Sequence, residues 1–434
     1  MPTSRPYHLT WLCDQIIKIR PRTILDVGIG YGSKGMLFRE YTDVWNGKMF
    51  EHYTIIDGVE IFPEYITDLQ RDIYDNIYIG DIMDLIDGMG FYELIYIGDV
   101  LEHFNKEEGK ILLEKLKQRC RYLIIVTPVQ VSEQGAVYGN EHETHRSEWA
   151  PMDFPNFDVL QIHNSLIATW KRPEVYYCEG MKFYGERMKS TFGFREYSGT
   201  EEERLLFMGL YFKEDYEVYK KHTGQKVVFW NGSDVSRLLQ HPEGVEILKE
   251  HPGIHVCHNE MLREELASVG ITAIVEPIFF AYVSDYKESF KPGKPLEVYI
   301  NAHPDREQEY GVTEAVMTLE GMEGVELYVY GIEGNSSGNI HYMGWFEEED
   351  ADKKMSQHHV CLRLNRHDGL SQLVIKAALW GHHIVSRIPI EGGHTIKSSE
   401  DLKIKVKELQ KEKKPNTKTR EFLKESNLNR FSWL

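Results

Sequence analysis

The chain has 434 residues, of which 41 % are hydrophobic and 27 % are charged. This composition is typical of a globular protein, and the length exceeds what one hydrophobic core ordinarily serves, so we expect two or three domains. Lys and Arg number 50 against 68 Asp and Glu, which gives a net charge of −18. Such an acidic balance argues against general nucleic-acid binding, which depends on cationic contacts to phosphates.

Five cysteines are scattered along the chain without a CxxC pair. This pattern favours a reducing compartment over a disulfide framework or a zinc site. The longest apolar runs, such as 122–129, have the length of a strand and are too short to span a bilayer. Because no charged segment followed by an apolar one opens the sequence either, we expect a cytoplasmic protein without a transmembrane segment.

Strand-like apolar runs alternate with helix-like segments, which predicts an α/β architecture of parallel sheets with crossover helices. A first series of expected strands covers 23–28, 53–57, 76–79, 93–97 and 121–127, with a last element near 159–171. A second series covers 205–211, 226–230, 254–257 and 272–275. A third covers 296–300, 325–330, 340–342, 359–364 and 383–386, and a charged helical tail interrupted at Pro415 follows from about 398. We therefore expect three Rossmann-like domains, at 1–172, 173–280 and 281–434.

A glycine-rich turn follows the first expected strand. An apolar run containing Asp26 leads into Gly28, Gly30 and Gly32, and a helix-compatible segment begins at Ser33. Glycines let the backbone turn sharply and approach a ligand closely, although a tight strand–helix turn needs glycine as well. The turn is therefore a candidate ligand site that needs support from its neighbours.

Acidic residues supply that support at the ends of the next three strands. Glu60 ends the second, where a carboxylate accepts both ribose hydroxyls of a nucleoside. Asp81 follows the third strand, placed to accept from an adenine amino group with Ile82 against the ring, and Asp99 follows the fourth. The carboxyl ends of parallel strands form one edge of a sheet, and open α/β sheets bind ligands at that edge.

These motifs resemble those of the class I S-adenosylmethionine-dependent methyltransferases, over about residues 20–170. The resemblance is carried by Asp26-Val27-Gly28-Ile29-Gly30-Tyr31-Gly32, Glu60, Gly80-Asp81-Ile82 and Asp99-Val100-Leu101-Glu102-His103. It implies that Asp26 and the glycines face the methionine moiety, that Glu60 holds the ribose and that Asp81 contacts adenine. An NAD site is the weaker alternative, because Asp26 puts a negative charge where a pyrophosphate would lie.

Methyl transfer to a hydroxyl needs a base that takes the proton. His142 and His145, flanked by Glu141 and Glu143, follow the fifth strand and are base or metal candidates. Alternatively, 139–149 is a surface loop whose end caps a helix before Trp149. The other acid/base candidates are Asp99 and His103, although His103 is also placed to cap the helix near Lys106. We predict no metal site.

A second strand–turn–helix motif lies at 360–381. An apolar strand leads to His367-Asp368-Gly369-Leu370-Ser371, and an amphipathic helix follows up to Gly381. Amide groups at Gly369, Leu370 and Ser371 would point at a diphosphate, and Arg363 and Arg366 would add charge-assisted contacts. Strand–glycine–helix geometry is also common in α/β folds without such a ligand.

This segment resembles the GT-B glycosyltransferases of the group-1, GT4-like type, over about 200–395. The resemblance implies that Asp368 is a catalytic and donor-binding acid, with a second acid eight residues later that holds the nucleotide ribose. Lys376 stands at that second position and departs from the pattern. It either contacts a phosphate, or marks a different donor, or marks a lost activity.

Other segments extend this second resemblance. The loop at Gly232, Ser233 and Asp234 is similar to the glycine-rich loop of the acceptor half, and Arg306 lies where the family often binds phosphate. The acceptor half is shortened, and the tail after 398 is placed to cross back onto the middle domain or to form a solvated helix. The resemblance implies a retaining enzyme that uses a UDP- or GDP-sugar without a metal.

Together the motifs predict a bifunctional enzyme. It would transfer a methyl group from S-adenosylmethionine, as an O-methylation, and a sugar from a nucleotide sugar. The expected acceptor is a glycan, a glycolipid or another small hydroxylated molecule. The alternatives are tailoring of a nucleobase or small natural product, and a methyltransferase whose GT-like half only binds glycan, which the departure at Lys376 favours.

Overall fold

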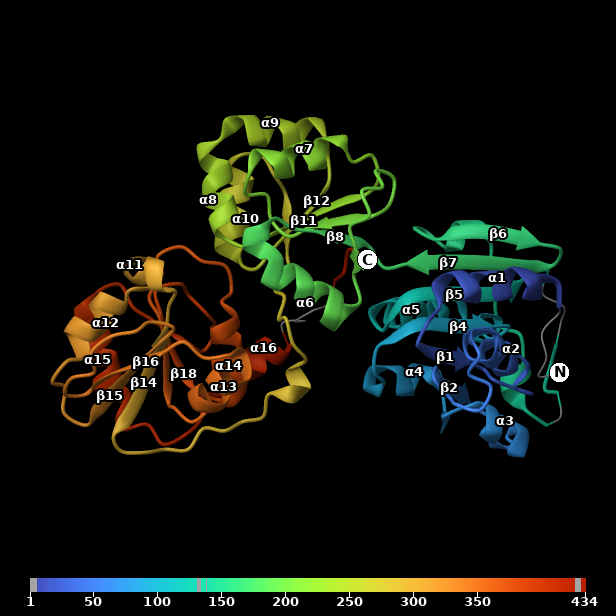
Figure 1. Ribbon diagram of the computed structural model, residues 1–434, viewed down its shortest axis with the longest axis horizontal. Coiled ribbons are helices and arrows are strands. Elements are labelled where there is room, and N and C mark those ends of the chain that lie inside the picture. The colour runs from blue at the N-terminus through green and yellow to red at the C-terminus, as the bar shows by residue number, and fades with distance from the viewer. Residues whose placement is uncertain (1–5, 131–133, 138, 426–430) are drawn as a thin grey trace. The chain divides into compact units, whose positions relative to one another are not determined.

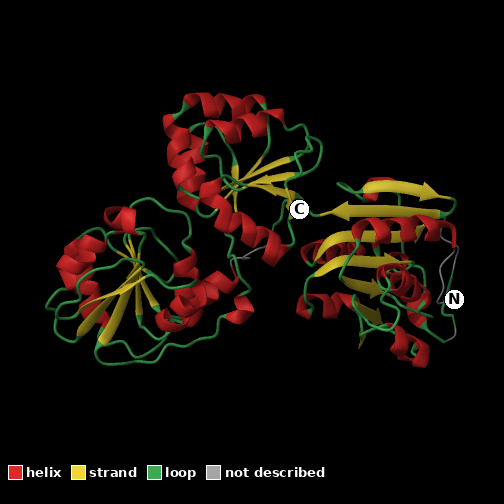
Figure 2. Ribbon diagram, in the orientation of Figure 1, coloured by secondary structure: helices red, strands yellow, loops and turns green. Residues whose placement is uncertain are grey.

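The computed structural model describes residues 6–130, 134–137, 139–425 and 431–434. The chain forms three β-sheets, each accompanied by helices (Figures 1 and 2). It divides into two compact units, one of Met1–Glu174, Phe192–Glu196 and Leu434, the other of Val175–Thr191 and Tyr197–Trp433.

The first sheet has seven strands in the order β3-β2-β1-β4-β5-β7-β6. Its strands are β1 Thr23–Val27, β2 Ile55–Glu60, β3 Asn76–Ile79, β4 Tyr92–Gly98, β5 Cys120–Pro128, β6 Asp158–Ile162 and β7 Ser165–Lys171. Its helices are α1 Leu9–Ile19, α2 Ser33–Thr42, α3 Asp68–Ile73, α4 Ile82–Leu85 and α5 Lys106–Gln118.

The strand directions in this sheet are mixed. Strands β1 to β5 pair in parallel, whereas β7 runs antiparallel to β5 and β6 runs antiparallel to β7. The single last element expected near 159–171 is therefore wrong in detail, because a tight turn at His163, where φ is 52°, folds it into a hairpin. The mixed sheet confirms the predicted Rossmann-like, methyltransferase-type fold.

The core of the first unit lies between this sheet and its first helices. Leu12 and Ile16 of α1 and Phe38 of α2 are fully buried against alternate residues of the central strands. The central strands β1, β4 and β5 are mostly buried, which is why they are continuous apolar runs in the sequence, whereas the outer strands β3 and β6 are largely exposed.

The second sheet has six strands in the order β13-β12-β11-β10-β8-β9. Its strands are β8 Glu174–Tyr176, β9 Arg195–Glu196, β10 Leu205–Phe207, β11 Lys226–Trp230, β12 Ile254–Cys257 and β13 Ala273–Val275. Its helices are α6 Lys182–Phe192, α7 Lys213–Lys221, α8 Ser233–Gln240, α9 Pro242–Glu250 and α10 Glu260–Ser268. The strands from β10 to β13 pair in parallel.

The third sheet also has six strands, in the order β16-β15-β14-β17-β18-β19, and its neighbours pair in parallel. Its strands are β14 Leu296–Asn301, β15 Val325–Tyr330, β16 Ile340–Gly344, β17 Val360–Arg363, β18 His383–Ser386 and β19 His394–Thr395. Its helices are α11 Glu307–Tyr310, α12 Val312–Leu319, α13 Glu348–Met355, α14 Gln372–Trp380, α15 Ser399–Leu409 and α16 Thr417–Glu425.

Helices cover both faces of the third sheet (Figure 1). Val298 and Ile300 of β14 pack on one face with α12 and α15, whereas Tyr299 packs on the other with α14 and with Leu423 of α16. This alternation follows from the two-residue period of a strand. It confirms a doubly covered parallel sheet of the kind that GT-B folds contain.

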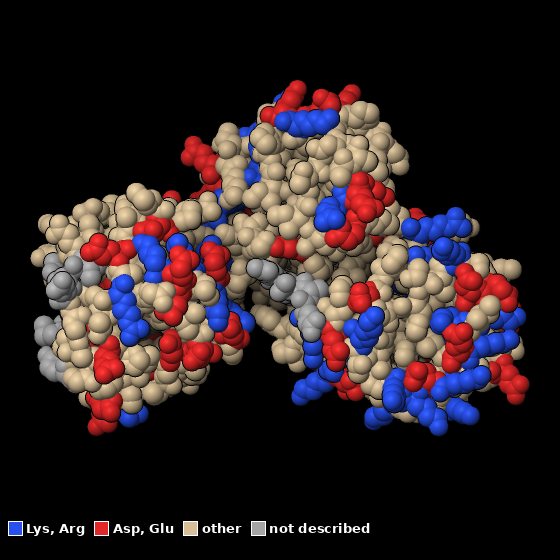
Figure 3. Space-filling view, turned by 180° about the vertical axis from the view of Figure 1, so that it is seen from behind, with Lys and Arg blue, Asp and Glu red and all other residues tan. Residues whose placement is uncertain are grey.

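The tail helix α16 packs on α14, and beyond it the amide of Ser432 donates to the Glu276 carboxylate, which follows β13 (3.0 Å to Oε2). No described helix has the length and apolarity needed to cross a membrane. On the face drawn in Figure 3, acidic side chains lie interspersed with Lys and Arg side chains.

Candidate functional site

A cavity of about 600 Å³ opens at the carboxyl ends of β1 to β4 in the first unit. Several residues that the sequence singled out line it together: Gly28, Gly30, Glu60, Asp81, Ile82, Asp99, His103, His142 and His145. Two others, Asp26 and Gly32, do not line it. The structure thus brings most of the predicted cofactor and base candidates to one site.

The glycine turn has the backbone that only glycine adopts easily. Gly28 has a φ of 76°, and a Cβ atom there would lie 2.2 Å from Cγ2 of Val100. The close approach lets the turn after β1 touch the segment after β4. Gly32, with φ 83°, instead occupies the N-cap position of α2.

Asp26 belongs to the wall behind the cavity. Its side chain is 1 % exposed, and Oδ2 accepts a hydrogen bond of 2.6 Å from the Tyr74 hydroxyl. Burial raises the pKa of Asp26 to about 6, although the Tyr74 bond and Lys34 act in the opposite direction. Burial also lowers the pKa of Lys34, which lines the cavity and is opposed in this by Asp26 and Asp99. This differs from the expectation that Asp26 faces the ligand.

Glu60 is held in place by backbone amides. Oε2 accepts from the Gly30 amide at 2.9 Å and Oε1 accepts from the Phe62 amide at 3.0 Å. Burial raises the pKa of Glu60, and these two bonds lower it. The carboxylate is therefore fixed in orientation and keeps lone pairs for a ligand, since each oxygen accepts more than one bond.

Asp81 and Ile82 lie at the start of α4. Asp81 is the N-cap, its Oδ1 accepts from the Met83 amide at 2.9 Å, and the residue lines the cavity. Ile82 is buried. A capping carboxylate followed by an apolar side chain forms a polar edge beside a flat apolar surface.

The segment after β4 carries Asp99, Glu102 and His103. Asp99 has a φ of 52°, a strained backbone for a residue with a side chain, and such strain gathers at functional sites. Asn105, not His103, caps α5, because its side chain accepts from the Glu108 amide at 3.0 Å. The capping alternative for His103 is therefore excluded.

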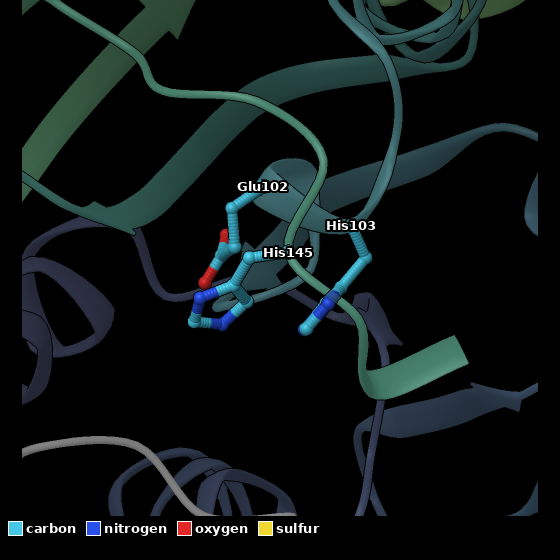
Figure 4. A group of neighbouring side chains, drawn as sticks. All are labelled: Glu102, His103 and His145. Atoms are coloured by element: carbon cyan, nitrogen blue, oxygen red, sulfur yellow. The ribbon is translucent and has the colours of Figure 1, made fainter. Parts of the chain in front are cut away.

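Glu102, His103 and His145 converge on one point (Figure 4). One ligand atom from each lies within 4.8 Å of the other two. Glu102 is 1 % exposed and accepts from the Thr127 hydroxyl at 3.0 Å. Burial, and then the nearby Asp99, raise the pKa of Glu102 well above its usual range, while burial lowers the pKa of His103.

The loop that carries His142 and His145 is anchored by its backbone. The amides of Arg146 and Ser147 donate to the Glu102 carbonyl at 2.8 and 3.1 Å. Within 139–149 the structure has only the short turn Glu141–Glu143, whose N-cap is Asn140, so residues 145–147 do not cap a helix before Trp149. His142 is exposed and lines the cavity.

In the second unit, the predicted donor residues pair with each other or with neighbouring helices. Arg363 donates to Asp368 at 2.7 Å and lies 4.6 Å from the Tyr310 ring. Lys376 donates to Glu348 at 2.7 Å and to Asp352 at 2.8 Å. The side chain of Lys376 is thus bound to two carboxylates of α13. One expectation from the sequence was that its amine would contact a phosphate.

The two glycine loops of this unit touch. The backbones of Gly232 and Gly369 are so close that a Cβ on Gly232 would lie 2.9 Å from the Gly369 nitrogen. Asp234 is fully buried and accepts from the amides of Asn231 and Gly232 at 3.0 and 2.8 Å, so it shapes the loop. Burial raises its pKa to about 6.

Residues 369–371 precede α14 rather than belong to it. Ser371 is the N-cap of that helix and Leu370 is partly buried. Arg306 lines a neighbouring cavity of about 990 Å³ with Ser233 and Arg366, and it also donates to Glu309 at 2.8 Å. Among the predicted donor and acceptor-loop residues, Arg306, Arg366 and Ser233 line this cavity.

Several residues of the first cavity escaped the sequence analysis. Glu102 belongs to the motif after the fourth strand but had no predicted role. Lys34, two residues after Gly32, was not predicted to line a site. Tyr65 donates to Glu143 at 3.0 Å and lines the same cavity. The sequence signal that could have identified Glu102 and Lys34 is a charged residue directly beside a predicted site.

No family model matches the chain, and no curated protein matches it either. Solved structures are similar to parts of it. An O-methyltransferase family protein from Burkholderia thailandensis is 10 % identical over 38 % of this chain and 57 % of its own, with a TM-score of 0.29. The chain thus spans little more than half of that protein.

Two further structures were solved with ligands. The N-terminal domain of EvdMO1, solved with SAH and D-fucose, is 12 % identical over 39 % of this chain and 84 % of its own, with a TM-score of 0.30. HepE of Anabaena, solved with UDP and glucose, is 8 % identical over 52 % of this chain and 74 % of its own, with a TM-score of 0.40.

Proposed function

We propose that the first unit transfers a methyl group from S-adenosylmethionine to a hydroxyl of a glycan, a glycolipid or another small hydroxylated acceptor. We further propose that the second unit binds a UDP- or GDP-sugar and transfers its sugar, so that both activities serve glycan biosynthesis or modification. The domains would be 1–172, 173–280 and 281–434. The observation that carries the methyl-transfer proposal is the single cavity at the ends of β1 to β4.

Different residues of the cavity would bind different parts of the methyl donor. The glycine turn at Gly28 and Gly30 leaves room for the methionine part. Glu60, fixed by its two amide bonds, would accept both ribose hydroxyls, and Asp81 with Ile82 would hold the adenine. Open α/β sheets bind ligands at this edge, because the loops after parallel strands meet there.

The acceptor would enter beside His103, His142 and His145, which line the cavity. A hydroxyl that attacks the methyl carbon must lose its proton, and a neutral imidazole at this position accepts it. Burial lowers the pKa of His103, so its ring is neutral near pH 7. Asp99, on its strained backbone, would position the substrate beside these rings.

Isothermal calorimetry with S-adenosylhomocysteine on the full chain tests this proposal. We expect one site per chain, and Glu60→Gln should weaken binding about 10- to 100-fold, because hydrogen bonds to a charged group contribute roughly 1.5–3 kcal/mol. Glu40→Gln, on the exposed surface of α2, is the matched control. Absence of binding, or equal affinity in both variants, would contradict the proposal.

For the second unit there is a second candidate function, which is binding without sugar transfer. The observation that favours it is the pairing of Lys376 with Glu348 and Asp352, which leaves no acid for a ribose at that position. Titration of the full chain with UDP and GDP tests whether the second unit binds a nucleotide at all. S-adenosylhomocysteine binding without binding of either nucleotide would refute the two-enzyme proposal.

A further inference from the structure

We infer that Glu102, His103 and His145 form a binding site for a divalent transition-metal ion, at which the acceptor hydroxyl binds. The use of the ion rests on the methyl transfer proposed above, whereas the site itself rests on the side chains. Glu102 and His103 come from the turn after β4 and His145 from the anchored loop, and all three point into the same space (Figure 4).

The donor atoms have the chemistry and spacing that such an ion requires. A carboxylate oxygen and two imidazole nitrogens lie within 4.8 Å of one another. Ligand atoms at bond lengths of about 2.0–2.2 Å from one ion lie roughly 3–4 Å apart, so a side-chain shift of about 1 Å closes the set. Rotation about χ angles supplies a shift of that size.

The ring of His103 is already oriented for coordination. Its Nδ1 lies 3.2 Å from the Thr144 carbonyl oxygen, and a carbonyl oxygen only accepts, so Nδ1 carries the proton. The lone pair is then on Nε2. Metal-bound histidines characteristically donate their other ring N–H to a carbonyl or carboxylate in this way.

Glu102 supplies a buried carboxyl group that a bound cation would hold in its charged form. Its carboxyl is 1 % exposed, it accepts one bond from Thr127, and its electrostatic neighbours Asp99 and Glu143 are acidic as well. Buried carboxylates are found paired or coordinating metals, because an uncompensated charge is costly in a protein interior. A divalent ion would compensate this cluster.

The loop geometry brings a distant histidine to this pair. The amides of Arg146 and Ser147 donate to the Glu102 carbonyl, and the His145 amide donates to the Gln134 carbonyl at 3.1 Å. The bonds of Arg146 and Ser147 tie the backbone just after His145 to the turn that carries the other two ligands, and the bond to Gln134 holds the His145 backbone to the segment after β5. Such support from outside the ligand set is what holds metal ligands in place.

Two imidazoles and one carboxylate select the class of ion. Imidazole suits Fe²⁺, Co²⁺ or Zn²⁺ better than Mg²⁺ or Ca²⁺, which prefer oxygen ligands. Three protein ligands leave positions for an acceptor hydroxyl, whose pKa falls on coordination. With His103 and His145 bound to the ion, the imidazole left to take the proton would be that of His142. The oxygen would attack the methyl carbon, and the C–S bond would break with its electron pair going to sulfur. The products are the methyl ether and S-adenosylhomocysteine.

The test uses untagged full-length protein, freed of metal with EDTA and titrated with CoCl₂ while the visible absorption of Co²⁺ is recorded. We expect one site per chain. His103→Ala, His145→Ala and Glu102→Gln should each weaken Co²⁺ binding at least ~10-fold, the loss already typical when only a supporting residue is removed. His142→Ala is the matched control, since His142 lines the same cavity outside the cluster and should leave Co²⁺ affinity unchanged.

Calorimetry with S-adenosylhomocysteine on every variant separates a lost ligand from a lost fold. His145→Ala is the decisive variant, because backbone bonds anchor its loop. No stoichiometric Co²⁺ binding, or equal affinity in wild type and His145→Ala, would overturn the site. S-adenosylhomocysteine binding without Co²⁺ binding would overturn the metal site alone, and the reverse result would overturn the methyl-donor proposal alone.

Discussion

At the scale of single residues, the hydrogen bond from Tyr74 to Asp26 links the stability of the first unit to pH. Burial raises the folded-state pKa of Asp26 from 3.8 to about 6, and the Tyr74 bond opposes this rise. The folded state therefore holds the proton to a higher pH than the unfolded chain does. Asp26 favours folding most below pH 4, and this contribution is lost as the pH rises toward 6.

Tyr74→Phe should destabilise the first unit by about 1–3 kcal/mol at pH 7, because it leaves a buried carboxylate without its 2.6 Å donor. The loss should be smaller at pH 5, where Asp26 is mostly protonated. Thermal unfolding at both pH values measures this, with Tyr31→Phe as control, since Tyr31 is 65 % exposed in the glycine turn. An equal loss at pH 5 and pH 7 would contradict the assigned role.

At the same scale, the acids that line the cavity could be predicted from the sequence, because their positions follow from the direction of the strands. Glu60, Asp81 and Asp99 each follow a strand, and parallel strands end at one edge, so local patterns sufficed to bring them together. The Glu102–His145 approach depends on how a loop folds back, which no periodicity encodes. Tyr74 likewise reaches Asp26 from the far end of α3, and that contact removes Asp26 from the cavity surface.

At the scale of elements, α13 and α14 are joined by Lys376, which donates to Glu348 at 2.7 Å and to both oxygens of Asp352 at 2.9 and 2.8 Å. The sequence predicted both the strand before α14 and the helix itself. The sequence did not predict the pairing of Lys376 with Glu348 and Asp352, because α13 and α14 are separated by the strand β17 and acidic residues on a helix are usually exposed to solvent. The cross-helix pairing gives Lys376 a structural role, which is to hold α13 against α14.

Lys376→Glu should destabilise the second unit by about 3–5 kcal/mol, because it breaks a buried ion pair and gathers three carboxylates. Thermal unfolding and a UDP titration measure the effect. The matched control is Lys403→Glu on the exposed face of α15, which should cost less than ~0.5 kcal/mol. A fully stable Lys376→Glu protein with tighter UDP binding would instead show that the lysine blocks a ribose site.

At the scale of the whole molecule, the two compact units have separate hydrophobic cores. The cavity at the ends of β1 to β4 is built from first-unit elements alone, and the touching glycine loops from second-unit elements alone. Ligands that bind a folded state stabilise it by mass action, about 2.7 kcal/mol at a concentration of 100 times Kd. Each ligand should therefore stabilise the unit that contains its site.

Calorimetric scanning of the full chain should resolve two transitions. S-adenosylhomocysteine at 100 times Kd should raise one of them by roughly 5–10 °C, since 1 kcal/mol shifts the Tm of a domain of this size by about 2–4 °C. UDP should raise the other transition. Glu60→Gln, with its about 10- to 100-fold lower affinity, should reduce the stabilisation at the same ligand concentration from about 2.7 to about 0.4–1.4 kcal/mol, which makes the first shift smaller without altering the second. Lys376→Glu should lower only the second transition. A single transition that both ligands raise together would show instead that the units unfold as one cooperative body, because mass action on one unit would then stabilise the other.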